Sequence, residues 1–236
     1  MTMSINLADA LEDAFERCRN MDASLSERLQ ALADAVRDLS PPFADTVDRL
    51  ISRLRQSDAG ATAPQPGDPM PPFLLPDEQG RMVALSDLLA HGPVAVTFHR
   101  GHWCPYCRIN TDALAKAQED IAAEGGQVVA VMPDRQQFAA EFKSELHASF
   151  PVLTDVDNGY ALSLNLAIWV GEEMERLIAA AGWDVPRYQG NNSWVLPIPA
   201  TFVVGTDGQV KARFVDPDYR NRMAIEDVLA ALRHAH

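Results

Sequence analysis

Residues 94–107 read Val-Ala-Val-Thr-Phe-His-Arg-Gly-His-Trp-Cys-Pro-Tyr-Cys, and the rest of the chain can be arranged around this stretch. Its first five residues form an apolar run, which predicts a buried strand. After the second cysteine, Ile109 and Ala113 recur at helical spacing. The two cysteines, Cys104 and Cys107, therefore lie where a strand passes into a helix.

This position favours thiol chemistry. The unpaired N–H groups and the dipole of a helix N-terminus stabilise a thiolate, and cysteines so placed have their pKa lowered from about 8.5 to roughly 3.5–7.5. Two intervening residues let a reversible disulfide close within one helical turn. We expect Cys104 to be the exposed nucleophile and Cys107 to resolve it by forming that disulfide.

A metal site is the alternative use of the same residues. Structural zinc sites need four ligands, usually from two separate pairs. The only other cysteine is Cys18, and His99 and His102 lie too close to the cysteine pair to supply a separate second arm. Redox chemistry is thus favoured over a binding protein that holds a metal at His99, His102, Cys104 and Cys107, and no cofactor is expected.

Composition narrows the partners. The net charge of −13 disfavours nucleic acid and anionic membranes, which attract basic surfaces. No run of about 18 apolar residues is present, so no membrane span is expected. Residues 1–15 lack the basic start and apolar core of a signal peptide. Three cysteines, one of them left over from the pair, fit a reducing, cytoplasmic location.

The chain divides into an N-terminal helical segment (1–56), a proline-rich linker (57–66) and a redoxin domain (67–236). Alternating apolar steps of three and four predict three amphipathic helices in the first segment. Their stripes must be covered, either by the main domain or by a second copy of the chain. We expect this segment to serve packing or association, outside the active site, and Cys18 to be an inert residue of the first stripe.

Strands alternate with helices in the redoxin domain, which predicts an α/β fold with a central mixed sheet. We expect a hairpin over 73–85, a long helix from Cys104 to about Glu124, and a second buried strand over 128–132. Asp134 is expected to cap the next helix, and residues 200–215 to form a β-hairpin. Residues 157–196 show a helix at 172–181 but are otherwise not assigned.

Four blocks of this domain resemble the alkyl hydroperoxide reductase/thiol-specific antioxidant family of the thioredoxin-fold superfamily, in an atypical Cys-Pro-Tyr-Cys subgroup. They are residues 67–76, 98–107, 196–202 and 214–219. The resemblance implies a thioredoxin-like fold and reduction of peroxides. It also assigns Pro199 and Thr201 to the site, with Pro199 as a cis proline that faces the reactive sulfur.

The chain departs from the usual family motif, Phe-x-Pro-x-x-x-Thr-x-x-Cys. When the chain is aligned to this motif without gaps, Arg100 takes the place of the proline, Cys104 that of the threonine and Cys107 that of the peroxidatic cysteine. In a later block, Pro199 takes the place of an arginine. This register makes Cys107 the first attacker, so the order of attack stays open. Arg100 is the nearest fixed cation for a thiolate, and His99 and His102 are candidate proton shuttles.

Two activities follow. The first is a peroxidase that reduces hydrogen peroxide or organic hydroperoxides and is recycled by a thioredoxin-like protein or glutathione. The second is a thiol–disulfide oxidoreductase that uses the same dithiol on protein disulfides. The missing threonine and arginine of the peroxide site are the feature that separates them. If copies of the chain associate, the N-terminal helices are the expected contact.

Overall fold

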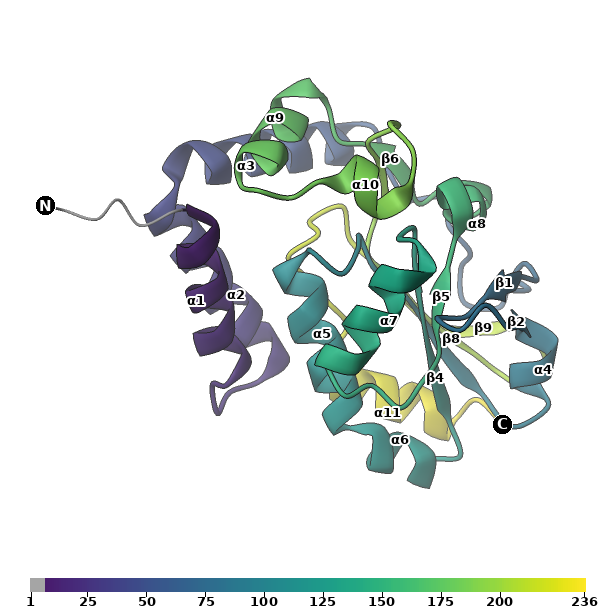
Figure 1. Ribbon diagram of the computed structural model, residues 1–236. Coiled ribbons are helices and arrows are strands. Elements are labelled where there is room, and N and C mark those ends of the chain that lie inside the picture. Colours follow the sequence, from purple (N-terminus) through teal and green to yellow (C-terminus); the bar gives the residue numbers. More distant parts are fainter. Residues whose placement is uncertain (1–6) are drawn as a thin grey trace, which may run out of the picture.

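The computed structural model describes residues 7–236, and its core is a five-stranded sheet of order β5-β4-β3-β8-β9 (Figure 1). Strands β3, β4 and β5 run parallel, whereas β8 pairs antiparallel with both β3 and β9. The bounds are β3 Val94–Phe98, β4 Gln127–Met132, β5 Val152–Thr154, β8 Ala200–Val204 and β9 Val210–Val215. This arrangement confirms the predicted α/β class with a central mixed sheet.

The two faces of the sheet carry different layers. On the face that includes Ala95 and Ala130 pack α5 Pro105–Lys116, α6 Gln118–Ala123, α7 Gln136–Glu145 and α11 Ile225–Arg233. On the face that includes Val96 and Phe98 pack β1 Leu74–Pro76, β2 Met82–Ala84, α4 Leu85–Leu89 and α8 Gly159–Ser163. Because β3 is buried on both faces, it is a continuous apolar run instead of an alternating one.

The helix expected from Cys104 to about Glu124 is two helices. It breaks at Ala117, whose backbone leaves helical geometry between α5 and α6. The break lets Ile121 of α6 pack fully buried beside Val128 of β4. Within residues 7–236, no helix is both long enough and apolar enough to cross a membrane.

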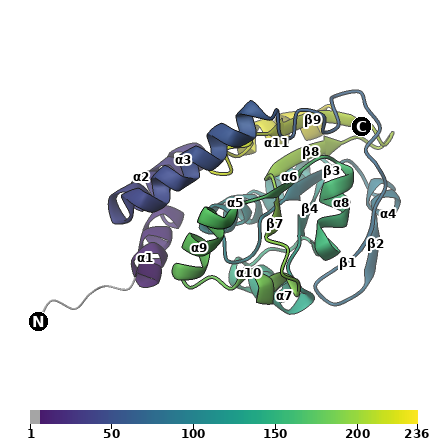
Figure 2. The ribbon, with the colours of Figure 1, turned by 90° about the horizontal axis from the view of Figure 1, so that it is seen from above.

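The N-terminal helices are α1 Leu7–Arg19, α2 Leu25–Leu39 and α3 Pro41–Gln56. Ser24 and Glu27 form a reciprocal capping box at the start of α2. Figure 1 shows α1 and α2 beside α5, and Figure 2 shows the same helices from above; α1 and α2 contact α5, and α3 contacts α9. Residues 1–6 of the predicted segment lie outside the described residues.

The apolar stripes of these helices face inward. Phe15 of α1 and Leu32 of α2 are fully buried in one cluster with Ile109 of α5 and Ile178 of α9. The main domain therefore covers the stripes, which is the first of the two alternatives that the sequence left open. Cys18 is 5% exposed in the same cluster, and burial raises its pKa.

Residues 57–66, the predicted linker, lie along the last strands of the sheet. Ala63 is 1% exposed, and Arg213 Nη2 of β9 donates a hydrogen bond of 3.0 Å to the carbonyl of Gly60. Gly60 has φ +80°, and a Cβ there would come within 2.8 Å of the Val215 side chain. This close approach requires glycine, so α3 joins the sheet through a packed connection.

The segment that the sequence left unassigned contains η1 Val156–Asn158, α8 and a two-stranded sheet. In that sheet, β6 Ala167–Trp169 pairs with β7 Val195–Pro197. Between these strands lie α9 Glu172–Ala180, close to the predicted helix, and α10 Val185–Gln189. The short strands carry this insertion over the start of α5, where it meets the N-terminal helices.

Candidate active site

Strand β3 delivers the cysteine pair to one end of the sheet. It ends at Phe98, and a loop of five residues leads to Cys104, which is the N-cap residue of α5. Pro105 occupies the first helical position, where its missing N–H costs no hydrogen bond and its fixed φ suits the helix. Cys104 therefore faces the unpaired N–H groups of α5, and Cys107 lies one turn into the helix.

The Cys104 thiol is 1% exposed, yet it is the acidic member of the pair. Burial raises its pKa, but the hydrogen bond from the Cys107 thiol and the charges of Arg100 and Arg222 lower it by more. The backbone N–H of Cys107 adds to these, and the resulting pKa of Cys104 is about 6. At neutral pH this sulfur is a thiolate.

The Cys107 thiol is fully buried, and its pKa is raised to about 12. Burial is the largest cause, followed by the hydrogen bond to Cys104 and the negative charge of that thiolate, while Arg222 and His99 act in the opposite direction. The backbone N–H of Arg100 and Nη2 of Arg222 each donate to the Cys107 sulfur at 3.4 Å.

Two buried arginines border the sulfurs. The Arg100 guanidinium lies 3.9 Å from the ring centroid of Tyr219 and 5.2 Å from that of Trp103. Arg222 donates from Nη1 to the carbonyls of Tyr219 and Asn221. Neither arginine pairs with a carboxylate anywhere in residues 7–236, although almost all other buried charges in proteins are paired. The thiolate of Cys104 is the anion that faces them.

Sequence reasoning named Arg100 but missed Arg222. Arg222 is 115 positions from Cys107 and belongs to the loop between β9 and α11. The resemblance ended at Tyr219, three residues earlier, so only the folding of this loop onto α5 brings Arg222 to the site. No local spacing in the sequence could have paired the two.

His99 lies beneath the pair, fully buried on the face of β3 that α5 covers. Its Nε2 lies 3.4 Å from Thr97 Oγ1 and 3.5 Å from Thr111 Oγ1, and Thr201 Oγ1 donates to Thr97 Oγ1 at 3.5 Å. The other nitrogen, Nδ1, makes no hydrogen bond. Thr201 is therefore connected to Cys107 only indirectly, through Thr97 and then His99, which lies beside Cys107.

His102 is placed differently from His99. Its backbone N–H and its Nδ1 both lie 2.7 Å from Asp134 Oδ2, and its ring stacks on Phe138. Asp134 was expected to cap α7, but Arg135 is the N-cap residue there and Asp134 holds the active-site loop instead. The reason is that Asp134 follows β4, which is parallel to β3, so both strands end at the same edge of the sheet.

The prediction of a cis Pro199 is wrong, because no cis peptide bond occurs within residues 7–236. Ile198 continues the pairing of the short sheet up to the proline, with its N–H 2.7 Å from the carbonyl of Leu166. The extended chain passes directly into β8, and the trans isomer is the ordinary one for such a bond. Pro199 is buried and lines a small cavity with Arg100 and Tyr219.

The N-terminal helices take part in the site, contrary to expectation. A cavity of about 20 Å³ lies against Cys104, and three N-terminal side chains line it, Leu11, Val36 and Phe43. Ile178, Trp183, Trp103 and Tyr219 complete most of its wall. The helices α1 and α2 contact α5, and α3 contacts α9. Cys104 is therefore enclosed by parts of the chain that lie far from it in sequence.

The four side chains of the metal alternative do not converge. His99 points into the threonine chain and His102 to Asp134. Across residues 7–236, no group of three or more histidine, cysteine, aspartate or glutamate side chains is arranged to hold a metal ion. All three cysteines are free thiols.

A model of the AhpC/TSA family matches residues 66–213, more than half of the chain. The chain belongs to the AhpC/TSA family. A protein of Mycobacterium tuberculosis (strain H37Rv) described as a peroxiredoxin is 33% identical over 145 residues, which cover 61% of this chain and 81% of that protein. The thiol-disulfide oxidoreductase ResA of Bacillus subtilis is 31% identical over 100 residues, which cover 42% of this chain and 55% of ResA.

Solved structures show the same fold. The peroxidoxin BcpB of Mycobacterium tuberculosis is similar with a TM-score of 0.57 and 22% identity, covering 73% of this chain and 99% of that chain. Peroxiredoxin 6 of Arenicola marina has a TM-score of 0.57 and 15% identity, covering 71% of each. This AhpC/TSA protein is thus a peroxiredoxin-like oxidoreductase of the thioredoxin fold, in the thiol peroxidase class.

Two parts of its site lie outside the matched family region. The helices α1–α3 end at Gln56, before the match begins, and Arg222 follows its end at residue 213. The AhpC/TSA core supplies the sheet, the cysteine helix and Arg100. Leu11, Val36 and Phe43, which line the cavity at Cys104, and Arg222, the second cation, lie outside the matched residues.

Proposed function

We propose that this AhpC/TSA protein reduces peroxides with a dithiol in which Cys104 attacks and Cys107 resolves. The observation that carries the proposal is the opposed acidity of two buried sulfurs beside two arginines without carboxylate partners. The pKa of Cys104 is lowered to about 6, and that of Cys107 is raised to about 12. The thiolate, and not the thiol, is the nucleophile.

The first step forms a sulfur–oxygen bond. The Cys104 thiolate attacks the terminal oxygen of a hydroperoxide, the O–O bond breaks, and the remaining alkoxide or hydroxide leaves and takes a proton. Cys104 becomes a sulfenic acid, oxidised by two electrons, while the peroxide is reduced to an alcohol or water. Arg100 and Arg222 donate hydrogen bonds toward the charge that moves from sulfur to oxygen, the role of a preorganised oxyanion site.

The second step closes the disulfide. Cys107 attacks the Cys104 sulfur, the S–O bond breaks, and the hydroxyl leaves as water after taking the proton of the Cys107 thiol. His99 lies beside Cys107 with Nδ1 making no hydrogen bond, and it can hold that proton in transit. Two thiols of a thioredoxin-like protein or of glutathione then reduce the disulfide by exchange. A reducing, cytoplasmic setting suits the three free thiols.

Single cysteine variants test the order of attack. The reduced protein is mixed with hydrogen peroxide in the presence of a sulfenic-acid trap such as dimedone, and peptide mapping locates the adduct. Cys107→Ser should accumulate the adduct on Cys104, and Cys104→Ser should react no faster than a free thiol. Cys18→Ser, which alters the third buried thiol, is the matched control and should behave as wild type.

Two outcomes would overturn the proposal. If Cys104→Ser kept fast peroxide reactivity, Cys107 would be the attacking residue, as the ungapped family register has it. If wild type consumed peroxide no faster than free cysteine but reduced a protein disulfide readily, the oxidoreductase activity would replace the peroxidase.

A further inference from the structure

The dithiol of this protein lies beneath a lid, by which we mean the hairpin of α1 and α2, residues 7–39. Cys104 is 1% exposed and Cys107 is fully buried. The cavity beside Cys104, about 20 Å³, is large enough for one water-sized molecule, and Leu11 and Val36 of the lid close it on one side. A protein disulfide cannot approach a sulfur in such a position unless the lid moves.

A buried carboxylate fastens the lid to the cysteine helix. Asp112 of α5 is 3% exposed and accepts from Arg28 Nη2 of α2 at 2.8 Å and from Arg19 Nε of α1 at 3.1 Å. Arg28 also donates to the carbonyls of Cys18 and Arg19, which ties the two lid helices together. Lys116 of α5 donates to the same carboxylate from the solvent side.

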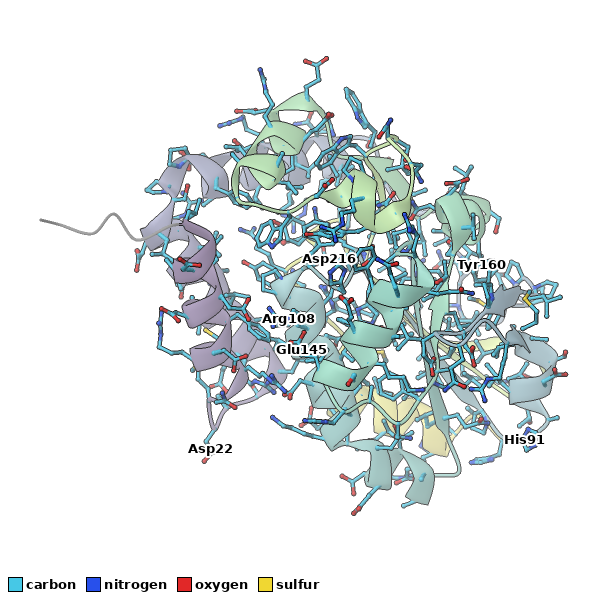
Figure 3. The ribbon with its side chains drawn as sticks, viewed as in Figure 1. Asp22, His91, Arg108, Glu145, Tyr160 and Asp216 are labelled. Atoms are coloured by element: carbon cyan, nitrogen blue, oxygen red, sulfur yellow. The ribbon has the colours of Figure 1, made fainter. Side chains whose placement is uncertain are left out.

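A second attachment lies at the surface. Arg108 of α5 binds Glu12 of α1 with two hydrogen bonds of 2.7 and 2.8 Å, and its guanidinium lies 3.7 Å from the ring centroid of Phe15. Figure 3 shows Arg108 next to Glu145 of α7, with which it also pairs, on the side of α5 that faces the lid. Both attachments are ionic, and they add to the apolar packing of α1 and α2 on α5.

The fixed end of α3 gives the lid a direction of opening. Residues 57–66 fix the end of α3 to the sheet, and α3 contacts the insertion helix α9. The α1–α2 hairpin meets α5 through these charged contacts and through the apolar cluster of Phe15, Leu32 and Ile109. Moving the hairpin away removes Leu11 and Val36 from the wall of the cavity at Cys104. Figures 1 and 2 agree that this hairpin is the outermost layer on the side of α5 away from the sheet.

We propose that the α1–α2 lid is the specificity element of this dithiol, a size filter that admits small oxidants while it is closed and has to open for any protein, whether a protein disulfide or a thioredoxin-like reductant. The ionic attachments at Asp112 and Arg108 hold it closed together with the apolar cluster around Phe15 and Leu32. The proposal rests on the proposed function in one respect, the assignment of Cys104 as the reacting sulfur. It adds that bulky reagents reach Cys104 only through opening of the lid.

Thiol alkylation tests the filter without any peroxide. The rate of Cys104 modification, located by peptide mapping, is measured with iodoacetamide and with a maleimide carrying a long polyethylene glycol chain. Each rate is divided by that of free cysteine at the same thiolate fraction. For wild type we expect the normalised rate of the bulky reagent to be at least about tenfold below that of the small one, because only the open form reacts with it.

Substitutions at the two ionic attachments should change only the rate at which the bulky reagent modifies Cys104. Glu12→Gln loses a partly exposed ion pair and should speed the bulky reagent about two- to fivefold, in line with the worth of such pairs. Asp112→Asn should speed it by more than tenfold, because the buried arginines lose their partner. Asp13→Asn, at an exposed neighbouring position of α1, is the matched control and should leave both rates unchanged.

The filter is wrong if wild type shows equal normalised rates for the two reagents, or if Glu12→Gln and added salt both leave the bulky rate unchanged. Should Asp112→Asn fail to fold, Glu12→Gln still decides the matter, because its ion pair is at the surface. A failed peroxidase assay with an intact size filter would overturn only the proposed function, since alkylation requires nothing but the thiolate.

Discussion

Replacing Arg222 by methionine should raise the pKa of Cys104. Arg222 donates to the Cys107 sulfur at 3.4 Å, and its charge is one of the causes that hold the pKa of Cys104 at about 6 against the effect of burial. An opposite charge within about 4–6 Å is worth about 1–3 pKa units. Taking the lower end, because Arg100 remains, we expect a pKa of about 7 in Arg222→Met.

The consequence is a loss of thiolate that depends on pH. At pH 6 the thiolate fraction should fall from about one half to about one tenth, a roughly fivefold loss, and above pH 8 the two proteins should differ little. The sign follows from the charge: without the cation the thiolate is less stable, so more base is needed to form it. The rate of peroxide consumption should follow the same curve.

The ultraviolet absorbance of the thiolate measures this without a reagent that has to pass the lid. Only Cys104 should titrate near pH 6, because the pKa values of Cys107 and Cys18 are both raised. Arg220→Met is the matched control: Arg220 lies in the same loop but pairs with Asp218 and Asp48 instead of the sulfurs. If Arg222→Met and Arg220→Met titrate alike, Arg222 does not stabilise the thiolate and the account of the site is wrong.

Two further predictions concern groups around the pair. Burial raises the pKa of Asp112, but its hydrogen bonds from Lys116, Arg28 and Arg19 lower it by more, so its stabilising effect is present above about pH 4 and is lost as the pH falls further. In urea unfolding, Asp112→Asn should lose less stability below about pH 4 than wild type, whereas other paired carboxylates such as Asp77 contribute equally in both proteins. His99→Gln should slow disulfide closure several-fold while leaving the pKa of Cys104 near 6. Stopped-flow measurement of sulfenic acid formation and then of disulfide formation will show this. An equal slowing of these two steps would indicate a merely structural role for His99.

The sequence predicted the parts of this molecule that depend on neighbours along the chain. The apolar run before Phe98 and the helical spacing after Cys107 placed β3 and α5, and hence Cys104 at the helix start. Periods of two and of 3.6 residues are set within a few positions, so they can be read without the fold.

Contacts across the chain could not be predicted in this way. Asp134 has the residue type and position of a helix cap. The parallel pairing of β3 and β4 instead places it beside His102, with which it forms a hydrogen bond. The amphipathic stripe of α1 showed that Leu11 needed a covering surface, and only the fold shows that this surface includes the cavity at Cys104. Periodicity identifies which face is buried, whereas the identity of the partner depends on topology.

The proposed order, in which Cys104 attacks and Cys107 resolves, is supported by how each sulfur affects the other. While Cys104 is a thiolate, its charge and its hydrogen bond help to hold the pKa of Cys107 near 12, so two adjacent thiolates do not coexist. Conversion of Cys104 to a sulfenic acid removes that charge, whereas Arg222 and His99, which lower the pKa of Cys107, stay in place. Cys107 therefore becomes easier to deprotonate only after Cys104 has become a sulfenic acid, whose hydroxyl Cys107 then displaces. An attack by Cys107 first, as the ungapped register implies, would require the less acidic and more deeply buried sulfur to ionise beside an existing thiolate.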